Sequence, residues 1–130
     1  MNRSSIQAPE PALGNVWLQA VMALPAGATL VDAADPDQPI VFCNPAFEEL
    51  SGYRQHEIIG NNCRFLQGED RTQEGVDEIR RALSQGRGCR VVLRNYRKDG
   101  SRFRNRVTMT PLTTGEGPRY VLGIQEDLDR

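Results

Sequence analysis

The stretch Gly60-Asn61-Asn62-Cys63-Arg64-Phe65-Leu66-Gln67-Gly68 lies between two segments with helical sequence signals. Before it, Asn44-Pro45 is a good helix start, because an Asn side chain caps free amides and Pro tolerates the first helical position. After it, apolar residues recur at helical spacing and predict a longer helix that ends at Gly86. The stretch is therefore a connection within the helical part of the chain.

Strand patterns flank this helical part on both sides. Residues 29–32 and 40–43 are β-like runs separated by a turn-rich stretch, and we expect them to form a hairpin. Residues 89–97, 101–112 and 120–127 follow as three antiparallel strands, the first two joined by a turn at Lys98-Asp99-Gly100. The order predicts an α+β fold in which short helices on one face of a five-stranded antiparallel sheet enclose a small-molecule pocket.

The chain ends differ in composition from this central part. Residues 1–15 are rich in Ser, Pro, Ala and Gln, so we expect a disordered extension. Residues 16–27 read as an amphipathic cap helix, which could cover the sheet in cis, cover it across a dimer, or simply pack locally. Residues 28–127 form the predicted domain, and 128–130 the start of a truncated linker.

Composition narrows the functional classes. Sixteen basic residues nearly balance seventeen acidic ones, so no overall field favours nucleic acid or an anionic membrane. Three cysteines without a secretory signal, and no long apolar run, predict a soluble, cytoplasmic protein. The single histidine, His56, excludes a multi-histidine metal site within one chain, and no dinucleotide-binding fingerprint is present. We therefore expect no metal and no enzyme activity.

Three strand amides point to the predicted interior. Side chains alternate along a strand, which places Asn105 with Phe103, Asn95 with Leu93, and Gln125 with Gly123 on inward faces. A buried amide without a partner costs on the order of 1 to 3 kcal/mol, so these amides need either each other or a polar ligand. An internal amide network explains any one of them, while three beside a glycine favour a planar heterocycle such as a flavin.

At residues 62–67 the sequence resembles the signature of light-oxygen-voltage (LOV) domains, a branch of the PAS superfamily. The similarity continues through residues 95–100, through Phe103 with Asn105, and through residues 123–125, and it covers about Ala28 to Asp127. The resemblance implies the PAS/LOV fold and a blue-light photoreceptor that binds FMN non-covalently in darkness. It also implies that Glu57 pairs with Lys98. A generic PAS ligand-binding or dimerisation module without photochemistry is the alternative.

The resemblance also implies individual roles. Cys63 matches the photoactive cysteine that bonds reversibly to flavin C4a in blue light, and Gln125 matches the amide that responds to protonation of flavin N5. Met109 departs from the leucine that we expect near the ring, and phosphate-binding arginines favour FMN, although an adenine-bearing flavin stays open. The implied flavin-binding residues are Asn62 and Gln67 (ribityl chain and polar edge), Arg64 and Arg80 (phosphate), Asn95, Asn105 and Gln125 (ring), and Thr29, Val31, Leu66, Ile79, Met109 and Gly123 (lining).

The opposite face of the predicted sheet mixes arginines with apolar side chains. Nucleic acid binding would suit the arginines alone, but the apolar residues between them favour a docking face for a helix or a second subunit. We therefore expect a homodimer that uses this outer sheet face, the terminal helices, or both, and no direct contact with nucleic acid or membrane. The residues of the outer face are Val92, Arg94, Tyr96, Arg102, Arg104, Arg106, Leu122 and Ile124.

Overall fold

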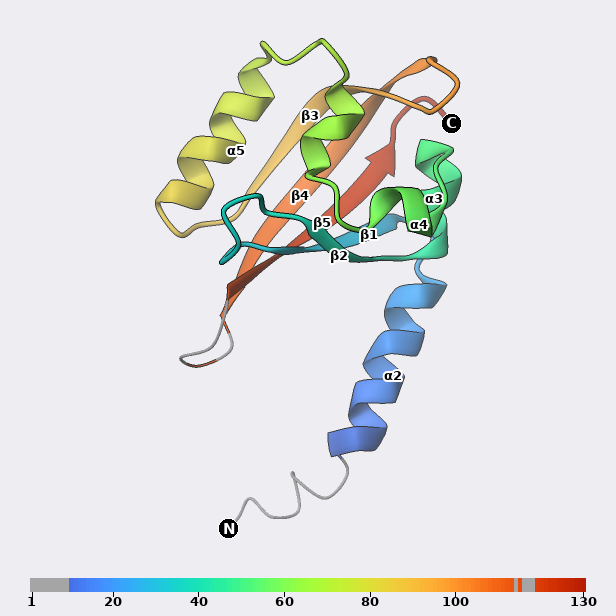
Figure 1. Ribbon diagram of the computed structural model, residues 1–130, viewed down its shortest axis with the longest axis vertical. Coiled ribbons are helices and arrows are strands. Elements are labelled where there is room, and N and C mark those ends of the chain that lie inside the picture. The colour runs from blue at the N-terminus through green and yellow to red at the C-terminus, as the bar shows by residue number, and fades with distance from the viewer. Residues whose placement is uncertain (1–9, 114, 116–118) are drawn as a thin grey trace.

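Five antiparallel strands form one sheet in the computed structural model, which describes residues 10–113, 115 and 119–130 (Figure 1). The strands lie in the order β2-β1-β5-β4-β3, so β5 is central and β2 and β3 are the edges. The predicted α+β class and five-stranded sheet are confirmed. The strands are β1 (Gly27–Asp32), β2 (Ile40–Cys43), β3 (Cys89–Tyr96), β4 (Arg102–Thr113) and β5 (Arg119–Asp127).

Short helices between β2 and β3 cover one face of the sheet (Figure 1). They are α3 (Pro45–Ser51), α4 (Gln55–Ile58), the 3₁₀ helix η1 (Cys63–Gln67) and α5 (Glu74–Ser84). The predicted start at Asn44 is confirmed, because its Oδ1 accepts hydrogen bonds from the backbone N–H of Phe47 at 3.0 Å and of Ala28 at 2.8 Å. The cap therefore ties α3 directly to the first strand.

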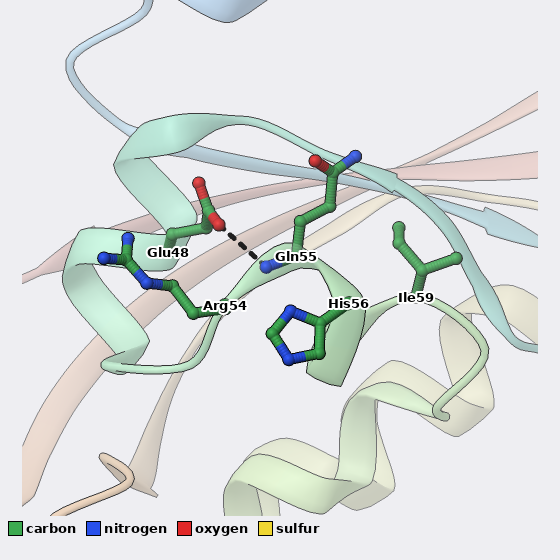
Figure 2. Close-up of a pocket in the computed structure, with 5 residues that line it drawn as sticks. All are labelled: Glu48, Arg54, Gln55, His56 and Ile59. Atoms are coloured by element: carbon green, nitrogen blue, oxygen red, sulfur yellow. Dashed lines mark hydrogen bonds between the residues drawn. The ribbon is translucent and has the colours of Figure 1, made fainter.

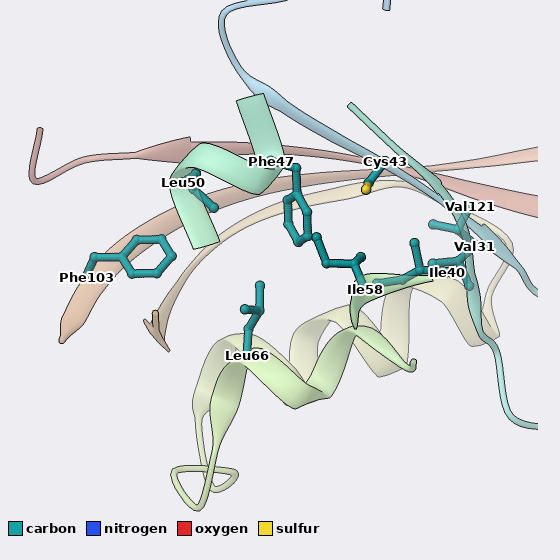
Figure 3. Packing of buried hydrophobic residues seen from close by; sticks show 9 residues of the cluster. All are labelled: Val31, Ile40, Cys43, Phe47, Leu50, Ile58, Leu66, Phe103 and Val121. Atoms are coloured by element: carbon teal, nitrogen blue, oxygen red, sulfur yellow. The ribbon is translucent and has the colours of Figure 1, made fainter. Parts of the chain in front are cut away.

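The core lies between this helical layer and the inner face of the sheet. Figure 3 shows Phe47 of α3 and Ile58 of α4 beside residues of the first strands, with Phe103 of β4 at the other end of the cluster. Phe47, Ile40 and Ile58 are fully buried. Burying such a side chain contributes roughly 1.5–3 kcal/mol. This packing fixes the helices that carry the Cys63 segment against the strands that carry the amides.

Helix α2 (Glu10–Ala23) begins earlier than the sequence indicates and leads away from the sheet (Figure 1). Residues 10–15, predicted to be disordered, belong to this helix, while residues 1–9 lie outside the described part of the chain. Its end is anchored by the Asn44 side-chain amide, which donates to the carbonyls of Val21 and Ala26. Because the Trp17 side chain is 68% exposed, α2 does not cover the sheet in cis.

Candidate functional site

The three inward amides lie on adjacent central and edge strands and are almost completely buried. Asn95, Asn105 and Gln125 are 2%, 1% and 3% exposed, as the alternation of side chains predicts. The Asn105 Nδ2 donates to Asn95 Oδ1 at 2.9 Å. Among the described residues, however, Asn105 Oδ1 and Gln125 Oε1 have no hydrogen-bond partner. The amide network is therefore incomplete on the side that faces the interior.

Gly123 makes room beside these amides. A Cβ at this position would lie 2.8 Å from Thr29 Oγ1, 3.0 Å from Gln125 Nε2 and 3.3 Å from the Met109 sulfur. Gln125 Nε2 donates to Thr29 Oγ1 at 3.1 Å, which joins β5 to β1. The absence of a side chain at residue 123 therefore lets four predicted site residues approach one another.

Cys63 opens η1 and reaches the same place from the helical layer. It packs against the core cluster that contains Val31 and Leu66, two predicted lining residues that are buried. Burial raises the pKa of the Cys63 thiol to about 11, and a hydrogen bond with Thr29 offsets part of this rise. The raised pKa means that the sulfur carries its proton at neutral pH.

The protonated state of Cys63 leads to a prediction about its reactivity. We expect iodoacetamide to alkylate Cys63 slowly in the dark at pH 7 to 9, with the rate rising as pH approaches about 11, because the thiolate is the nucleophile. Mass spectrometry of the modified peptide over a pH series measures this. A midpoint near the ordinary thiol value of 9.0 would contradict it.

The remaining predicted site residues lie on η1, α5 and β4, and those on α5 and β4 pack against the two core clusters. Gln67 is buried at the end of η1. Ile79 of α5 and Met109 of β4 pack against a second cluster formed by Val91, Leu93 and Val107, and Met109 also packs against the first cluster. Met109 therefore bridges the two halves of the core next to Gly123.

Three predicted residues lie apart from the buried amides. The Asn62 side chain caps η1 through Arg64 N at 2.9 Å and donates to Asp37 O at 2.9 Å. Arg64 is exposed, and Arg80, whose side chain is 75% exposed, pairs with Asp77 at 3.3 Å. A charged phosphate is bound more readily near solvent than in the core, so exposed guanidinium groups are suitable donors for one.

The chemistry of these residues fits the polar edge of a flavin. That edge presents both hydrogen-bond donors and acceptors in one plane, and Asn105 Oδ1 and Gln125 Oε1, which have no partner in the described part of the chain, each need a donor. The amide nitrogens supply donors in return. The interior cluster therefore matches a planar heterocycle better than a closed amide network, which would leave no oxygen unpaired.

Two surface hollows lie elsewhere. Figure 2 shows the first, between α3 and α4, where Glu48 Oε2 accepts from Gln55 N at 2.7 Å beside Arg54, His56 and Ile59. The second is lined by Gly68, Glu69, Asp70 and Tyr96. Both hollows are open to solvent, and neither is lined by a predicted site residue. The candidate site is therefore the interior cluster around the buried amides of Asn105 and Gln125, whose oxygens lack partners among the described residues. The described residues include no group of three metal-ligating side chains.

Polar contacts also join segments that lie far apart in the chain. The predicted pairing of Glu57 with Lys98 is confirmed at 2.7 Å. Arg97 and Asp127 form a second ion pair at 2.7 Å, with side chains only 12% and 9% exposed. The sequence reasoning missed this pair and also missed Gln73, a buried residue at the start of α5. In the sequence, these three residues appear only as polar residues close to apolar patterns. Such a pattern does not show which distant residue each side chain contacts.

Comparisons with known proteins agree with this geometry. A PAS domain family model matches residues 26–129. A blue-light photoreceptor of Listeria monocytogenes is 40% identical over 114 residues, which are 88% of this chain and 45% of that protein. The chain therefore spans less than half the length of this curated relative.

Solved structures give the same picture. An RNA-binding light-oxygen-voltage receptor superposes with a TM-score of 0.86 at 36% identity, covering 92% of this chain and 34% of that one. The Rhodobacter sphaeroides LOV protein superposes with a TM-score of 0.79 at 41% identity, covering 87% and 65%. In the part of the chain that the structure describes, no helix combines the length and apolar character needed to cross a bilayer.

Proposed function

This chain is a LOV domain of the PAS superfamily, and from that premise we propose that it senses blue light through bound FMN and a reversible bond to Cys63. One observation carries the proposal: among the described residues, the buried oxygens Asn105 Oδ1 and Gln125 Oε1 have no hydrogen-bond partner, and Gln125 contacts Thr29, which hydrogen-bonds with the Cys63 thiol. A polar, planar ligand beside the thiol would offer hydrogen-bond partners to these buried amides. The domain would act as a sensor rather than an enzyme.

Cys63 carries the chemistry in this proposal. When bound, the flavin supplies blue-light absorption and, once excited, an electrophilic ring carbon, C4a. Cys63 would supply both the sulfur for the reversible bond and the proton that its thiol gives up to the flavin, so no separate base would be needed. Holding the thiol in place matters more than ionising it, which agrees with its raised pKa. In darkness the Cys63 sulfur would regain its proton and the thiol would be restored.

Gln125 would convert the proton transfer into a structural change. Its Nε2 already donates to Thr29, and its Oε1 has no partner among the described residues. A ring nitrogen without a proton is an acceptor and would favour the orientation in which Nε2 faces the ring, whereas the same nitrogen with a proton is a donor and would favour Oε1 there. Turning the amide would exchange the group that faces Thr29 and disturb the contact between β5 and β1.

Replacing Gln125 with Leu tests this role. We expect the variant to bind flavin and form the light product, but to lose most of the light-induced amide I difference signal, because Leu cannot reverse donor and acceptor. Infrared difference spectroscopy measures the signal, with Gln55→Leu on exposed α4 as the matched control. A difference spectrum equal to that of the wild type would rule out Gln125 as the switch.

Two exposed arginines would favour a flavin that carries a phosphate group. Arg64 and Arg80 are exposed on η1 and α5 and offer two guanidinium groups for a terminal phosphate. This favours FMN over riboflavin. Mass spectrometry of the flavin released from purified protein distinguishes FMN, riboflavin and FAD.

We also keep a homodimer and a cytoplasmic location as proposals. The outer sheet face exposes 51% of Val92 next to its arginines, and α2 exposes Trp17, so both surfaces offer apolar area to a second copy. The three free cysteines suit a reducing compartment. Direct contact of this domain with nucleic acid or membrane is not part of the proposal.

The absorption spectrum tests the function directly. Purified protein should show flavin bands in the blue that bleach after a blue flash to a near-ultraviolet species and return in darkness. A colourless protein that stays inert after reconstitution with FMN would contradict the proposal and leave a generic PAS ligand-binding or dimerisation module.

A further inference from the structure

The Gln73 side chain closes the free edge of strand β3. Gln73 is 5% exposed, and its Oε1 accepts from the backbone N–H of Arg94 at 2.8 Å. Its Nε2 donates to the carbonyl of Arg94 at 3.0 Å and to that of Asp70 at 2.6 Å. Because β3 is an edge strand, one amide side chain thus takes the place of a neighbouring strand at a single residue.

The same carbonyl also holds a side chain of the proposed flavin site. Asn95 Nδ2 donates to the carbonyl oxygen of Arg94 at 3.0 Å, the atom that accepts from Gln73. Asn95 Oδ1 in turn accepts from Asn105 Nδ2. A continuous chain of hydrogen bonds therefore runs from Gln73 through the Arg94 peptide to the two asparagines.

The loop before α5 is fixed at a second point close by. Asp70 binds the Arg94 guanidinium through two contacts of 2.7 and 2.8 Å and accepts from the Tyr96 hydroxyl at 2.8 Å. Arg94 and Tyr96 point to the outer side of β3, whereas Asn95 points inward. The Asp70 contacts therefore locate the loop against the strand through side chains, while Gln73 hydrogen-bonds directly to the backbone carbonyl that also accepts from Asn95.

We propose that Gln73 is a positioning residue that sets the orientation of the Asn95 amide, and through it the hydrogen bonds offered to the polar edge of the flavin. The inference rests on the function proposed above. With Gln73 in place, one lone pair of the Arg94 carbonyl is occupied, and Asn95 Nδ2 is held by the other. Without it, the Arg94 N–H and carbonyl lose both contacts to Gln73, so the backbone at Arg94 can shift and carry the Asn95 amide with it.

Two substitutions separate positioning from general stability. Gln73→Leu removes both contacts to Arg94, whereas Gln73→Glu keeps an acceptor for the Arg94 N–H and, as a carboxylate, removes the donor to its carbonyl. Gln85→Leu, at the exposed end of the same helix, is the matched control. Each variant is measured by thermal unfolding, flavin dissociation rate, flavin carbonyl infrared bands and the NMR signals of the Asn95 side-chain NH₂.

We expect both Gln73 variants to move the Asn95 NH₂ signals and the flavin carbonyl bands, with flavin released roughly fivefold faster, the factor expected for one hydrogen bond. The control should match the wild type. A lower Tm with unmoved Asn95 signals and unchanged carbonyl bands would overturn the inference and leave Gln73 as an edge cap only. If Leu prevents folding, Gln73→Glu decides by the same readouts.

The NMR readout keeps the two proposals distinguishable. A wild-type protein that binds no flavin would contradict the proposed function. The NMR signals of the Asn95 side chain would still show whether Gln73 orients that amide. Conversely, both Gln73 variants could show a normal photocycle and unchanged Asn95 signals. That result would contradict the positioning role of Gln73 and leave the proposed photosensory function intact.

Discussion

Cys63→Ala is expected to keep the dark flavin spectrum and to lose the light-driven bleach completely. The Cys63 side chain lies in the core cluster beside Thr29, and truncating it removes the sulfur without removing any amide that would hold the flavin. The protein should therefore stay yellow. Flash spectroscopy should show only a short-lived excited state that returns without the near-ultraviolet product.

Another cysteine, Cys89, provides the matched control. Cys89 is partly exposed at the start of β3, outside the proposed site, so Cys89→Ala should bleach and recover as the wild type does. A Cys63→Ala protein that still bleached to the same product would show that another group bonds to the flavin. Loss of pigment in this variant would instead mean that Cys63 is needed for binding.

Asp127→Ala is expected to lower the free energy of unfolding by about 3 kcal/mol, because it leaves a nearly buried Arg97 without its counter-ion. Arg97 also donates to the carbonyl of Leu50 at 3.1 Å and lies 4.2 Å from the centre of the Phe103 ring, so it cannot leave the interior freely. Denaturant titration of the flavin-free protein measures the loss without a contribution from ligand binding.

The double substitution Arg97→Met with Asp127→Leu is the control for this pair. Replacing both charges by apolar groups of similar size should bring stability back to within about 1 kcal/mol of the wild type, since neither charge then stays unpaired. If the single and double variants lose equal stability, packing and not the unpaired charge explains the effect.

The sequence predicts which residues face inward more reliably than what they contact. Alternation along β3, β4 and β5 places Asn95, Asn105 and Gln125 in the interior, because a strand has a fixed period of two. The helix cap at Asn44 can be predicted equally well, since a cap is a local interaction between near neighbours in the chain. Both kinds of prediction need only positions close together in the chain.

Contacts between distant segments leave no comparable pattern. Gln73 binds the backbone of Arg94, and any residue type could supply that peptide group. Arg97 and Asp127 are one choice among many possible charge pairs, and only the arrangement of β3 and β5 brings them together. The early start of α2 has no clear sequence signal, because residues 10–15 include Pro11 and Gly14, two residue types of low helix propensity.

The central position of β5 has a consequence for how the domain forms during synthesis. Strand β1 pairs with β5, so Thr29 meets Gly123 only after the chain has been made as far as β5. Until then the first strand has only β2 beside it, and a lone hairpin is marginally stable in water. Pairing across such a long loop slows folding. Thr29 and Gln125, which belong to the proposed flavin site, therefore come together only at that point, so we expect a nascent chain to bind no flavin before β5 leaves the ribosome.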